Sequence, residues 1–238
     1  MSDTALKARI RRLLKEHLAL HGFELQKPRI VQRRIDHLRQ GIEFQPGTGH
    51  LAGKYAVNVY WSFTHALDEE GTMAVCKRIG ELSGSGDNWF SRADSDLDTD
   101  FAVVEKLVRE FALPYLTRYD TIAKIVVANK AGGNGISKLI TAPLTRRLAG
   151  AFGKTVFGPL SPMDAFGIDE GWRHFNWGYC ESVLGNTDAA IVHYQEVVTK
   201  HSADPYDWVR ERKDAANEQL RWLRGERTQP NKTGNAPD

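Results

Sequence analysis

The stretch "KYAVNVYWSFTH" (54–65) constrains the fold of this chain more than any other. Large apolar side chains occupy every second position: Tyr55, Val57, Val59, Trp61 and Phe63. The residues between them are smaller or more polar: Ala56, Asn58, Tyr60, Ser62 and Thr64. Because successive side chains of a strand point to opposite faces, this alternation predicts a strand with one buried face. One-sided burial is typical of an antiparallel sheet.

The flanking residues supply partners for this strand. "RIVQRRIDHLRQGIEFQ" (29–45) contains two extended stretches with a turn near Asp36 and His37. The link "PGTGHLAG" (46–53) is rich in turn formers and fits a hairpin connection. A fourth strand is expected within 72–82. The first part of the chain is therefore predicted to hold an antiparallel sheet.

Helical periodicity surrounds the predicted sheet. Residues 3–20 place one apolar stripe on a helix capped by Asp3 or Thr4 and ended by Gly22, and its members are Leu6, Ile10, Leu13, Leu14 and Leu18. A second helix follows Phe101 and is bent or ended by Pro114. Asp120 is expected to cap a third helix.

The predicted class is α+β, with an antiparallel N-terminal sheet, flanking helices and an all-helical C-terminal region. The α+β domain is expected over residues 1–130. A linker with a short helix follows over 131–170, then a helical hairpin plus a C-terminal helix over 171–225. The tail, 226–238, is predicted to be disordered because it is polar and has no large apolar side chain.

The composition of the chain is that of an ordinary soluble protein. It has 238 residues, 41% of them hydrophobic, and a formal net charge of +2, which gives no overall attraction to nucleic acid or membrane. No apolar run approaches the roughly 20 residues that span a bilayer. The charged N-terminus is unlike a secretory signal. Two distant cysteines, Cys76 and Cys180, predict reduced thiols and a cytoplasmic location.

An acidic run, "RADSDLDTDF" (92–101), is the clearest candidate for chemistry. Its carboxylates recur at every second position and a glutamate follows: Asp94, Asp96, Asp98, Asp100 and Glu105. Counted from Asp94, these match ligand positions of an EF-hand calcium loop, which uses hard oxygen ligands. However, Thr99 stands where that loop requires glycine, and "GSGDNWFSRA" is a poor incoming helix.

The alternative is an acidic entry to a helix. Carboxylates at a helix start accept hydrogen bonds from free backbone N–H groups and favour the positive end of the dipole. Asp98 or Asp100 would cap a helix that begins near Phe101, with Glu105 on that helix. This interpretation needs fewer conditions and leaves calcium open. The sequence thus predicts an acidic binding surface formed by Asp87, Asp94, Asp96, Asp98, Asp100 and Glu105, with no catalytic residues, metal or cofactor.

Other candidates favour structural roles. His174 and Cys180 are six positions apart, so a helix would place them on different faces, away from nucleophile–base contact. "KAGGNGIS" (130–137) lacks the lysine of a phosphate loop and is interpreted as a linker. The histidines at 37, 50 and 65 lack metal-ligand spacing. A basic group could meet nucleic acid or an acidic protein, but a solvated helix face is the commoner cause: Lys7, Arg9, Arg11, Arg12, Lys15, Arg33, Arg34 and Arg39.

Five short segments follow one another over about residues 5–125: "HGFELQK", "IEFQ", "YAVNVYWS", "RIGELSGSGDNWFSRADSD" and "FALPYL". In these segments and their order, the first half of the chain resembles a bacterial family known as domain of unknown function 4304. This resemblance implies an α+β domain without established catalytic residues. It supplies no active site for this chain.

The later helical part, about 171–204, has small and aromatic residues at regular positions: Gly178, Gly185, Ala190 and Tyr194. With these residues it resembles a single tetratricopeptide-type repeat. Small residues let paired helices approach closely, and the aromatic ring fills the groove between them. Glu181 stands where the pattern has a large aromatic residue. Since an array usually needs about three repeats, one hairpin packed on the first domain is expected.

These features favour a non-enzymatic, protein-binding bacterial protein. Charge is segregated, with ten Lys/Arg against five Asp/Glu in residues 1–50 and six against twelve in 66–120. One specific form is an immunity protein that neutralises a basic toxin, since such inhibitors often use electrostatically steered occlusion. One alternative is an enzyme or nucleic-acid-processing factor whose site is assembled from distant residues, such as His50 or His65 with carboxylates. Another is an adaptor that uses the helical hairpin. Membrane partners are not expected, and nucleic acid is disfavoured.

Overall fold

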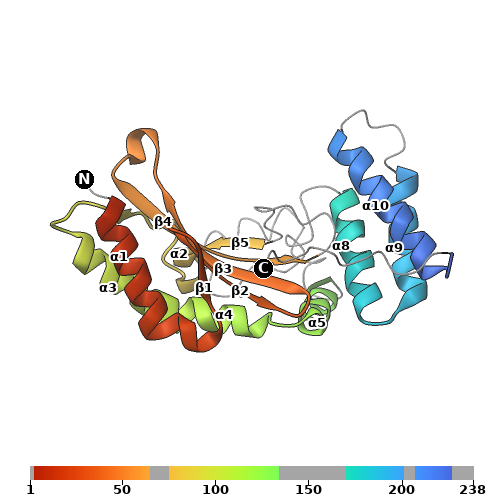
Figure 1. Cartoon of the computed structure of the whole chain (residues 1–238), viewed down its shortest axis with the longest axis horizontal. Coiled ribbons are helices and arrows are strands. Elements are labelled where there is room, and N and C mark those ends of the chain that lie inside the picture. The colour runs from red at the N-terminus through yellow and green to blue at the C-terminus, as the bar shows by residue number, and fades with distance from the viewer. Residues whose placement is uncertain (1–2, 65–74, 134–169, 201–206, 227–238) are drawn as a thin grey trace, which may run out of the picture. The chain divides into compact units, whose positions relative to one another are not determined.

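The computed structural model describes residues 3–64, 75–133, 170–200 and 207–226 (Figure 1). The chain divides into two compact units. The described elements from α1 to α5 belong to the first unit, and α8, α9 and α10 belong to the second. Within these residues, no helix combines the length and apolar character needed to cross a membrane.

The first unit is built around a six-stranded antiparallel sheet with the order β1-β2-β3-β4-β5, and β6 also pairs with β4. The strands are β1 (Glu24–Lys27), β2 (Ile30–Ile35), β3 (Leu38–Pro46), β4 (Lys54–Phe63), β5 (Val75–Arg78) and β6 (Phe90–Ser91). Asp36, with φ 47°, forms the predicted turn between β2 and β3. The antiparallel sheet and the hairpin from β3 to β4 confirm the sequence-based prediction.

The register of β3 and β4 gives the sheet two different faces. Phe44 lies opposite Val57, and Gln40 lies opposite Trp61, so these side chains share the face that packs on helices. The Phe44 ring stacks on Phe101 with centroids 6.0 Å apart. The other face carries polar side chains from four strands: Gln32, Arg34, Arg39, Glu43, Gln45, Asn58, Tyr60, Ser62, Cys76 and Arg78. We call this second surface the polar face.

Helices cover the apolar face of the sheet, and α1, α3 and α4 lie on one side of it in Figure 1. The helical elements of this unit are α1 (Asp3–Leu13), η1 (Leu14–Leu18), η2 (Ala19–His21), η3 (Gly49–Leu51), α2 (Ile79–Ser83), α3 (Leu97–Leu107), η4 (Val108–Ala112), α4 (Leu113–Arg118) and α5 (Ile122–Gly133). The predicted stripe of the first helix is buried at Leu6, Ile10, Leu13 and Leu18. Gly22, with φ 79°, ends this helical stretch as predicted.

Three details differ from the sequence-based expectations. Strands β1 and β6 were not predicted, because each has only two to four residues and shows little alternation. Pro114 does not end its helix, since it lies in the first turn of α4, directly after the π-helical turn η4. Thr121 rather than Asp120 accepts the hydrogen bond from the backbone N–H of Lys124, while Asp120 pairs with the ammonium of Lys124.

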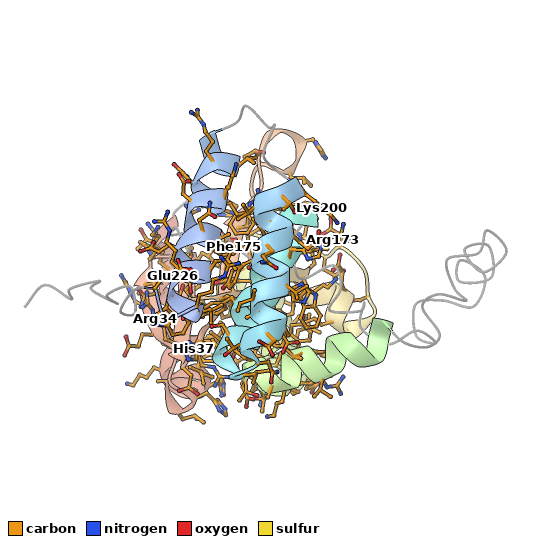
Figure 2. The ribbon with its side chains drawn as sticks, turned by 90° about the vertical axis from the view of Figure 1, so that its right-hand side faces the viewer. Arg34, His37, Arg173, Phe175, Lys200 and Glu226 are labelled. Atoms are coloured by element: carbon orange, nitrogen blue, oxygen red, sulfur yellow. The ribbon has the colours of Figure 1, made fainter. Side chains whose placement is uncertain are left out.

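The second unit consists of α8 (Glu170–Val183), α9 (Thr187–Lys200) and α10 (Asp207–Leu223). The predicted hairpin of α8 and α9 turns at Gly185, which has φ 78°. A Cβ at Gly178 would lie only 3.0 Å from the Tyr194 ring, so glycine permits the close approach of α8 and α9. Phe175 lies inside this unit, in a core with Ala190, Tyr194, Val197, Ala216 and Leu220 (Figure 2).

The predicted domain boundaries are only partly visible. The three helices lie within the expected range 171–225, apart from Glu170. Most of the expected linker and tail, namely residues 134–169 and 227–238, lies outside the described residues. Because α5 continues to Gly133, the first residues of "KAGGNGIS" are helical.

Candidate functional site

The polar face depends on a close approach between two strands. A Cβ at Gly41 would lie 2.3 Å from the Tyr60 ring, so Tyr60 lies across β3 at the one position without a side chain. The Tyr60 hydroxyl then donates to Gln32 Oε1 on β2 at 3.1 Å. Arg39 donates through Nε to Ser62 Oγ at 3.1 Å. Hydrogen bonds therefore connect β2, β3 and β4 on this face.

Arg78 on β5 connects the polar face to the loop that follows α2. Its Nη1 donates to Asn58 Oδ1 at 2.8 Å and to Gln45 Oε1 at 3.0 Å. Its Nε lies 3.3 Å from a carboxylate oxygen of Asp87. Its guanidinium lies 4.9 Å from the centroid of the Trp89 ring. Arg78 is thus held by partners on both sides, and its planar group can stack and donate simultaneously.

The loop that presents Asp87 and Trp89 has a defined backbone. Gly84 and Gly86 have φ 79° and 86°, a region that glycine adopts without strain. The backbone N–H groups of Ser85 and Gly86 both donate to the carbonyl of Gly80, at 2.8 and 3.1 Å. The Asn88 amide donates to Ser85 Oγ at 2.7 Å. We call residues 84–89 the Trp89 loop.

Arg78, Asp87 and Trp89 form one surface cluster. The indole Nε1 of Trp89 donates to Asp87 Oδ2 at 3.2 Å, so each member contacts the other two. The side chain of Asp87 is 59% exposed and that of Arg78 is 22% exposed. Trp and Arg are enriched among the residues that contribute most to protein–protein affinity. A cluster already fixed by internal contacts loses little conformational freedom on binding.

Sequence reasoning missed Arg78 and Trp89 as site residues. Both lie in the quoted segment "RIGELSGSGDNWFSRADSD", and only its acidic members were selected. A tryptophan within a run of small and polar residues is a usable signal, because such a loop has few large side chains to bury the ring, and the structure leaves Trp89 half-buried. The pairing with Arg78 was not visible, since it depends on the position of β5 at the edge of the sheet.

The predicted acidic surface is partly occupied by internal contacts. Asp98 pairs with Arg9 on α1, and Asp100 accepts a hydrogen bond from the backbone N–H of Ser91. Glu105 lies 2.8 Å from His17 Nε2 and 3.8 Å from Arg12. The remaining carboxylates are exposed: Asp87, Asp94 and Asp96. The six residues are therefore not one free surface, and three of them attach α3 to α1 and β6.

The calcium-loop interpretation of this stretch does not fit the structure. Helix α3 begins at Leu97, four residues earlier than predicted, so most of the twelve positions from Asp94 to Glu105 are helical. The carboxylates of Asp98 and Glu105, at the fifth and twelfth positions, are directed to different partners, Arg9 and His17. An EF-hand loop requires both carboxylates to converge on one ion. Asp96 precedes the helix without a capping side-chain hydrogen bond, and Asp98 and Asp100 lie in its first turn, where they favour the positive dipole end.

The predicted basic group is also divided. Arg9 and Arg12 pair with carboxylates of α3, and Arg33 donates to Gln40 on the helix-covered face. Arg39 is buried on the polar face. One continuous phosphate-binding patch would require these side chains on a single exposed surface, so the structure does not bring the group together.

Three potential metal ligands meet between η1 and α3. The ligand atoms of Glu16, His17 and Glu105 all lie within 4.8 Å of one another. Arg12 is close to both carboxylates, 3.9 Å from Glu16 and 3.8 Å from Glu105. We call these four residues the Glu-His-Glu cluster. Within the described part of the chain, this is the group whose donors could hold a metal ion.

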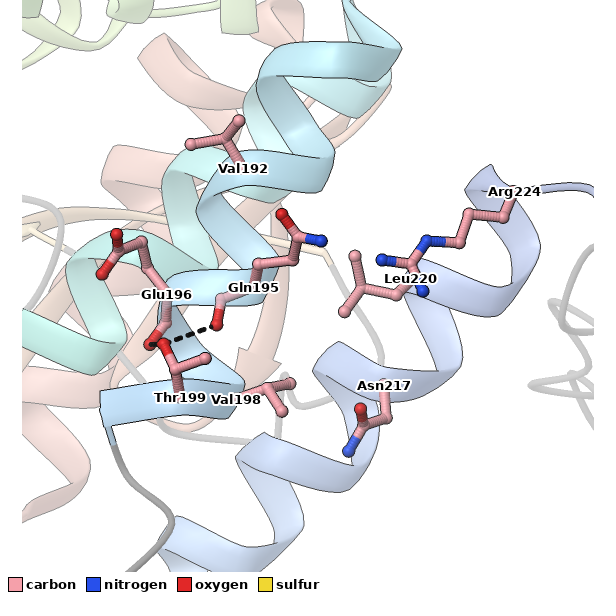
Figure 3. Close-up of a pocket in the computed structure, with 8 residues that line it drawn as sticks. All are labelled: Val192, Gln195, Glu196, Val198, Thr199, Asn217, Leu220 and Arg224. Atoms are coloured by element: carbon pink, nitrogen blue, oxygen red, sulfur yellow. Dashed lines mark hydrogen bonds between the residues drawn. The ribbon is translucent and has the colours of Figure 1, made fainter.

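The helical unit has a groove between α9 and α10 (Figure 3). It has a volume of about 390 Å³ and is lined by Val192, Gln195, Glu196, Val198, Thr199, Asn217, Leu220 and Arg224. This lining contains one carboxylate and no histidine, so these eight residues do not include the acid–base pair expected of an enzyme.

The contact between α8 and α9 brings two histidines together. His193 Nδ1 lies 3.1 Å from His174 Nδ1.

The cysteines and histidines considered as catalytic candidates in the sequence do not form a common site among the described residues. Cys76 and Cys180 are both free thiols. Cys180 is fully buried in α8, and burial raises the pKa of its thiol well above the ordinary value, which disfavours a reactive thiolate. His174 contacts His193 rather than forming the Cys–His pair considered above. His50 is exposed in η3, and His65 lies outside the described residues.

Comparisons with known proteins identify no relative. No family model, no curated protein and no solved structure matches this chain. The resemblances to domain of unknown function 4304 and to a tetratricopeptide-type repeat therefore stay predictions.

Proposed function

We propose that the chain is a non-enzymatic protein-binding protein and that it binds through the Trp89 loop and the adjacent polar face. The observation that carries this proposal is the preformed cluster of Arg78, Asp87 and Trp89. Its guanidinium–ring distance is 4.9 Å, and its two polar contacts measure 3.2 and 3.3 Å. A partner would meet a rigid aromatic and charged surface rather than a flexible loop.

The chemistry of the surrounding residues supports binding over catalysis. The side chains that surround Arg78 are amides and carboxylates: Gln45, Asn58, Glu43 and Asp87. They can orient hydrogen bonds to a partner. On the polar face, Ser62 accepts a hydrogen bond from Arg39, whose guanidinium cannot serve as a base. Partial burial and the nearby Glu43 raise the pKa of the Cys76 thiol, which disfavours the thiolate that nucleophilic catalysis requires.

The specific form of the proposal is an immunity protein, with a basic toxin as the partner. Asp87 is the exposed carboxylate of the cluster, and Asp94 and Asp96 are exposed nearby in the sequence. These charges would steer a basic surface toward the Trp89 loop. The cytoplasmic location and the bacterial origin belong to this proposal as well.

The test is co-expression of the full chain with the product of each neighbouring gene. We expect protection from a toxic neighbour and a complex that elutes as one species in size-exclusion chromatography. Trp89→Ala and Asp87→Lys should each weaken the complex at least about tenfold, as removal of a central interface residue does. Asp214→Lys, at an exposed carboxylate on α10, is the matched control and should leave affinity unchanged.

Two results would contradict the proposal. Unchanged affinity in both Trp89→Ala and Asp87→Lys would remove this surface from the interface. Absence of any complex with all neighbouring products would remove the immunity form. Circular dichroism of each variant distinguishes a lost interface from a lost fold.

A further inference from the structure

We infer that the Glu-His-Glu cluster binds a divalent transition-metal ion of the Zn²⁺ type, with Glu16, His17 and Glu105 as ligands. The site joins η1 to α3 and is separate from the Trp89 loop. It does not depend on the proposed function, since a metal at this position would act on the helices that cover the sheet.

The donor set selects the class of ion. One imidazole nitrogen and two carboxylate oxygens suit Zn²⁺ and similar ions, whereas Mg²⁺ and Ca²⁺ prefer oxygen ligands alone. Three protein ligands would leave one position of a tetrahedral ion open to water. His17 and Glu105 are 88 residues apart in the chain, so the fold rather than a local motif brings these ligands together.

The distances allow the three ligands to share an ion after a small movement. Bonds of about 2.0–2.2 Å from zinc to nitrogen and oxygen, at the tetrahedral angle, place two ligands of one ion about 3.3–3.6 Å apart. His17 Nε2 and Glu105 Oε1 are already 2.8 Å apart, and all three donors lie within 4.8 Å. Glu16 is 50% exposed and can rotate toward the other two.

The local backbone also favours a special role for these residues. Glu16 and His17 both lie in η1, a π-helical turn. π-Helical turns are rare and occur frequently at functional sites. Glu105 is on α3, close to a second π-helical turn, η4. The side chains of His17 and Glu105 are 26% and 21% exposed, which leaves the cluster open to an ion from solvent while limiting its hydration.

Arg12 gives the inference a distinctive consequence. Its guanidinium lies 3.8–3.9 Å from carboxylate oxygens of Glu16 and Glu105, so it neutralises part of the negative charge that would attract the ion. A bound divalent ion would be repelled by Arg12. Removal of this positive charge should therefore strengthen metal binding. If the cluster only attaches η1 to α3, the same substitution should weaken that attachment and give no gain in metal affinity.

The experiment is calorimetric titration of the full chain with Zn²⁺ after treatment with a chelator, followed by titration with Mg²⁺. We expect one Zn²⁺ per chain and no measurable heat with Mg²⁺. His17→Gln and Glu105→Gln should each weaken Zn²⁺ binding by roughly tenfold or more, and Arg12→Gln should strengthen it severalfold. His21→Gln, which changes an exposed histidine in η2, is the matched control and should bind as the unchanged chain does.

Cobalt spectroscopy identifies the ligands without relying on stability. Co²⁺ bound at the cluster should show visible absorption without a thiolate charge-transfer band, and Cys76→Ser should not change the spectrum. The inference is overturned if the chain binds no Zn²⁺, if His17→Gln binds as tightly as the unchanged chain, or if Arg12→Gln lowers the affinity. Each variant is first checked by circular dichroism, and Glu16→Gln supplies a second ligand test if Glu105→Gln is unfolded.

Discussion

On one face of the sheet Trp61 and Phe44 pack against aromatic rings of the helical layer, whereas on the other face Tyr60 and Asn58 are held by hydrogen bonds to other strands. Trp61 and Tyr60 are adjacent in the chain, so the pleat alone assigns them to these different environments. Apolar contacts on the first face stabilise the fold, but they do not depend on the direction in which a side chain points. Tyr60 and Asn58 are buried, but the hydrogen bond that Asn58 accepts from Arg78 fixes the direction of a partly exposed side chain, which is the property a binding surface needs.

The largest expected effect is on the apolar face. Trp61 is 1% exposed and contacts Phe63 and Tyr119. Trp61→Ala should lower the free energy of unfolding by about 3–5 kcal/mol, because it removes buried area and leaves a cavity. Urea denaturation followed by circular dichroism measures this change. A loss below that of the Tyr60→Phe variant would contradict the contrast between the faces.

A smaller loss is expected where α2 meets the Trp89 loop. A Cβ at Gly80 would lie 2.1 Å from the backbone carbonyl oxygen of Gly86, so Gly80→Ala must displace the loop. We expect destabilisation of about 1–3 kcal/mol from overpacking. Gly84→Ala is the control for backbone strain without overpacking. Its Cβ meets open space, so only its positive φ should contribute, at about 1–2 kcal/mol.

Binding distinguishes the two glycine variants further. If the proposed function holds, Gly80→Ala should weaken the complex, since the Trp89 ring moves with the loop, while Gly84→Ala should weaken it less. Equal affinities for the two folded variants would show that the loop conformation is irrelevant to the partner.

The polar face should respond weakly to loss of a single hydrogen bond. Tyr60→Phe removes the donor to Gln32 and keeps the ring above Gly41. The expected loss in the free energy of unfolding is about 0.5–1.5 kcal/mol, the net contribution of an ordinary hydrogen bond. Thermal unfolding of the purified variant checks it, and a loss as large as that of Trp61→Ala would contradict the prediction.

The smallest expected effect is a gain. The buried hydroxyl of Tyr55 has no hydrogen-bond partner among the described residues, so Tyr55→Phe should stabilise the fold by up to about 1 kcal/mol. Burial, assisted by Asp100, raises the pKa of Tyr55 above its ordinary value.

The raised pKa of Tyr55 gives the pH dependence a definite sign. Above about pH 10, the unfolded chain loses this proton while the folded chain keeps it, so stability falls as pH rises. Tyr55→Phe should reduce that alkaline fall. Chemical denaturation between about pH 8 and 11, which spans the ordinary tyrosine pKa, measures it, and an unchanged slope would contradict the assignment.

Much of the first unit could be predicted from sequence, because its main signals are local. The alternation in 54–65 predicted β4, and the stripe from Leu6 to Leu18 predicted the first helix. The expectation that only one face of β4 is buried was wrong, because every residue from Tyr55 to Phe63 is buried and neighbouring strands cover the polar side chains as well. The helical hairpin was predicted from its small residues and its turn at Gly185. Short strands such as β6 were missed, since two residues cannot show a period.

The candidate sites were harder to predict because they join distant residues. Asp98 and Glu105 were seen as free acidic groups, whereas Arg9 and His17 reach them across 88 or 89 positions. Arg78 and Trp89 are closer in sequence, but their contact requires β5 at the sheet edge and a loop shaped by Gly80. Charge spacing along a chain does not show which charges the fold will pair.

The order of the strands also has a consequence for how this unit assembles. From β1 to β5, each strand pairs with the next one along the chain, so the sheet closes mainly short loops and can form early. The side-chain contacts of α1 and η1 with α3 must instead close loops of nearly ninety residues. During synthesis on a ribosome, α1 is made first, yet its charged partners on α3 emerge only after the whole meander of strands.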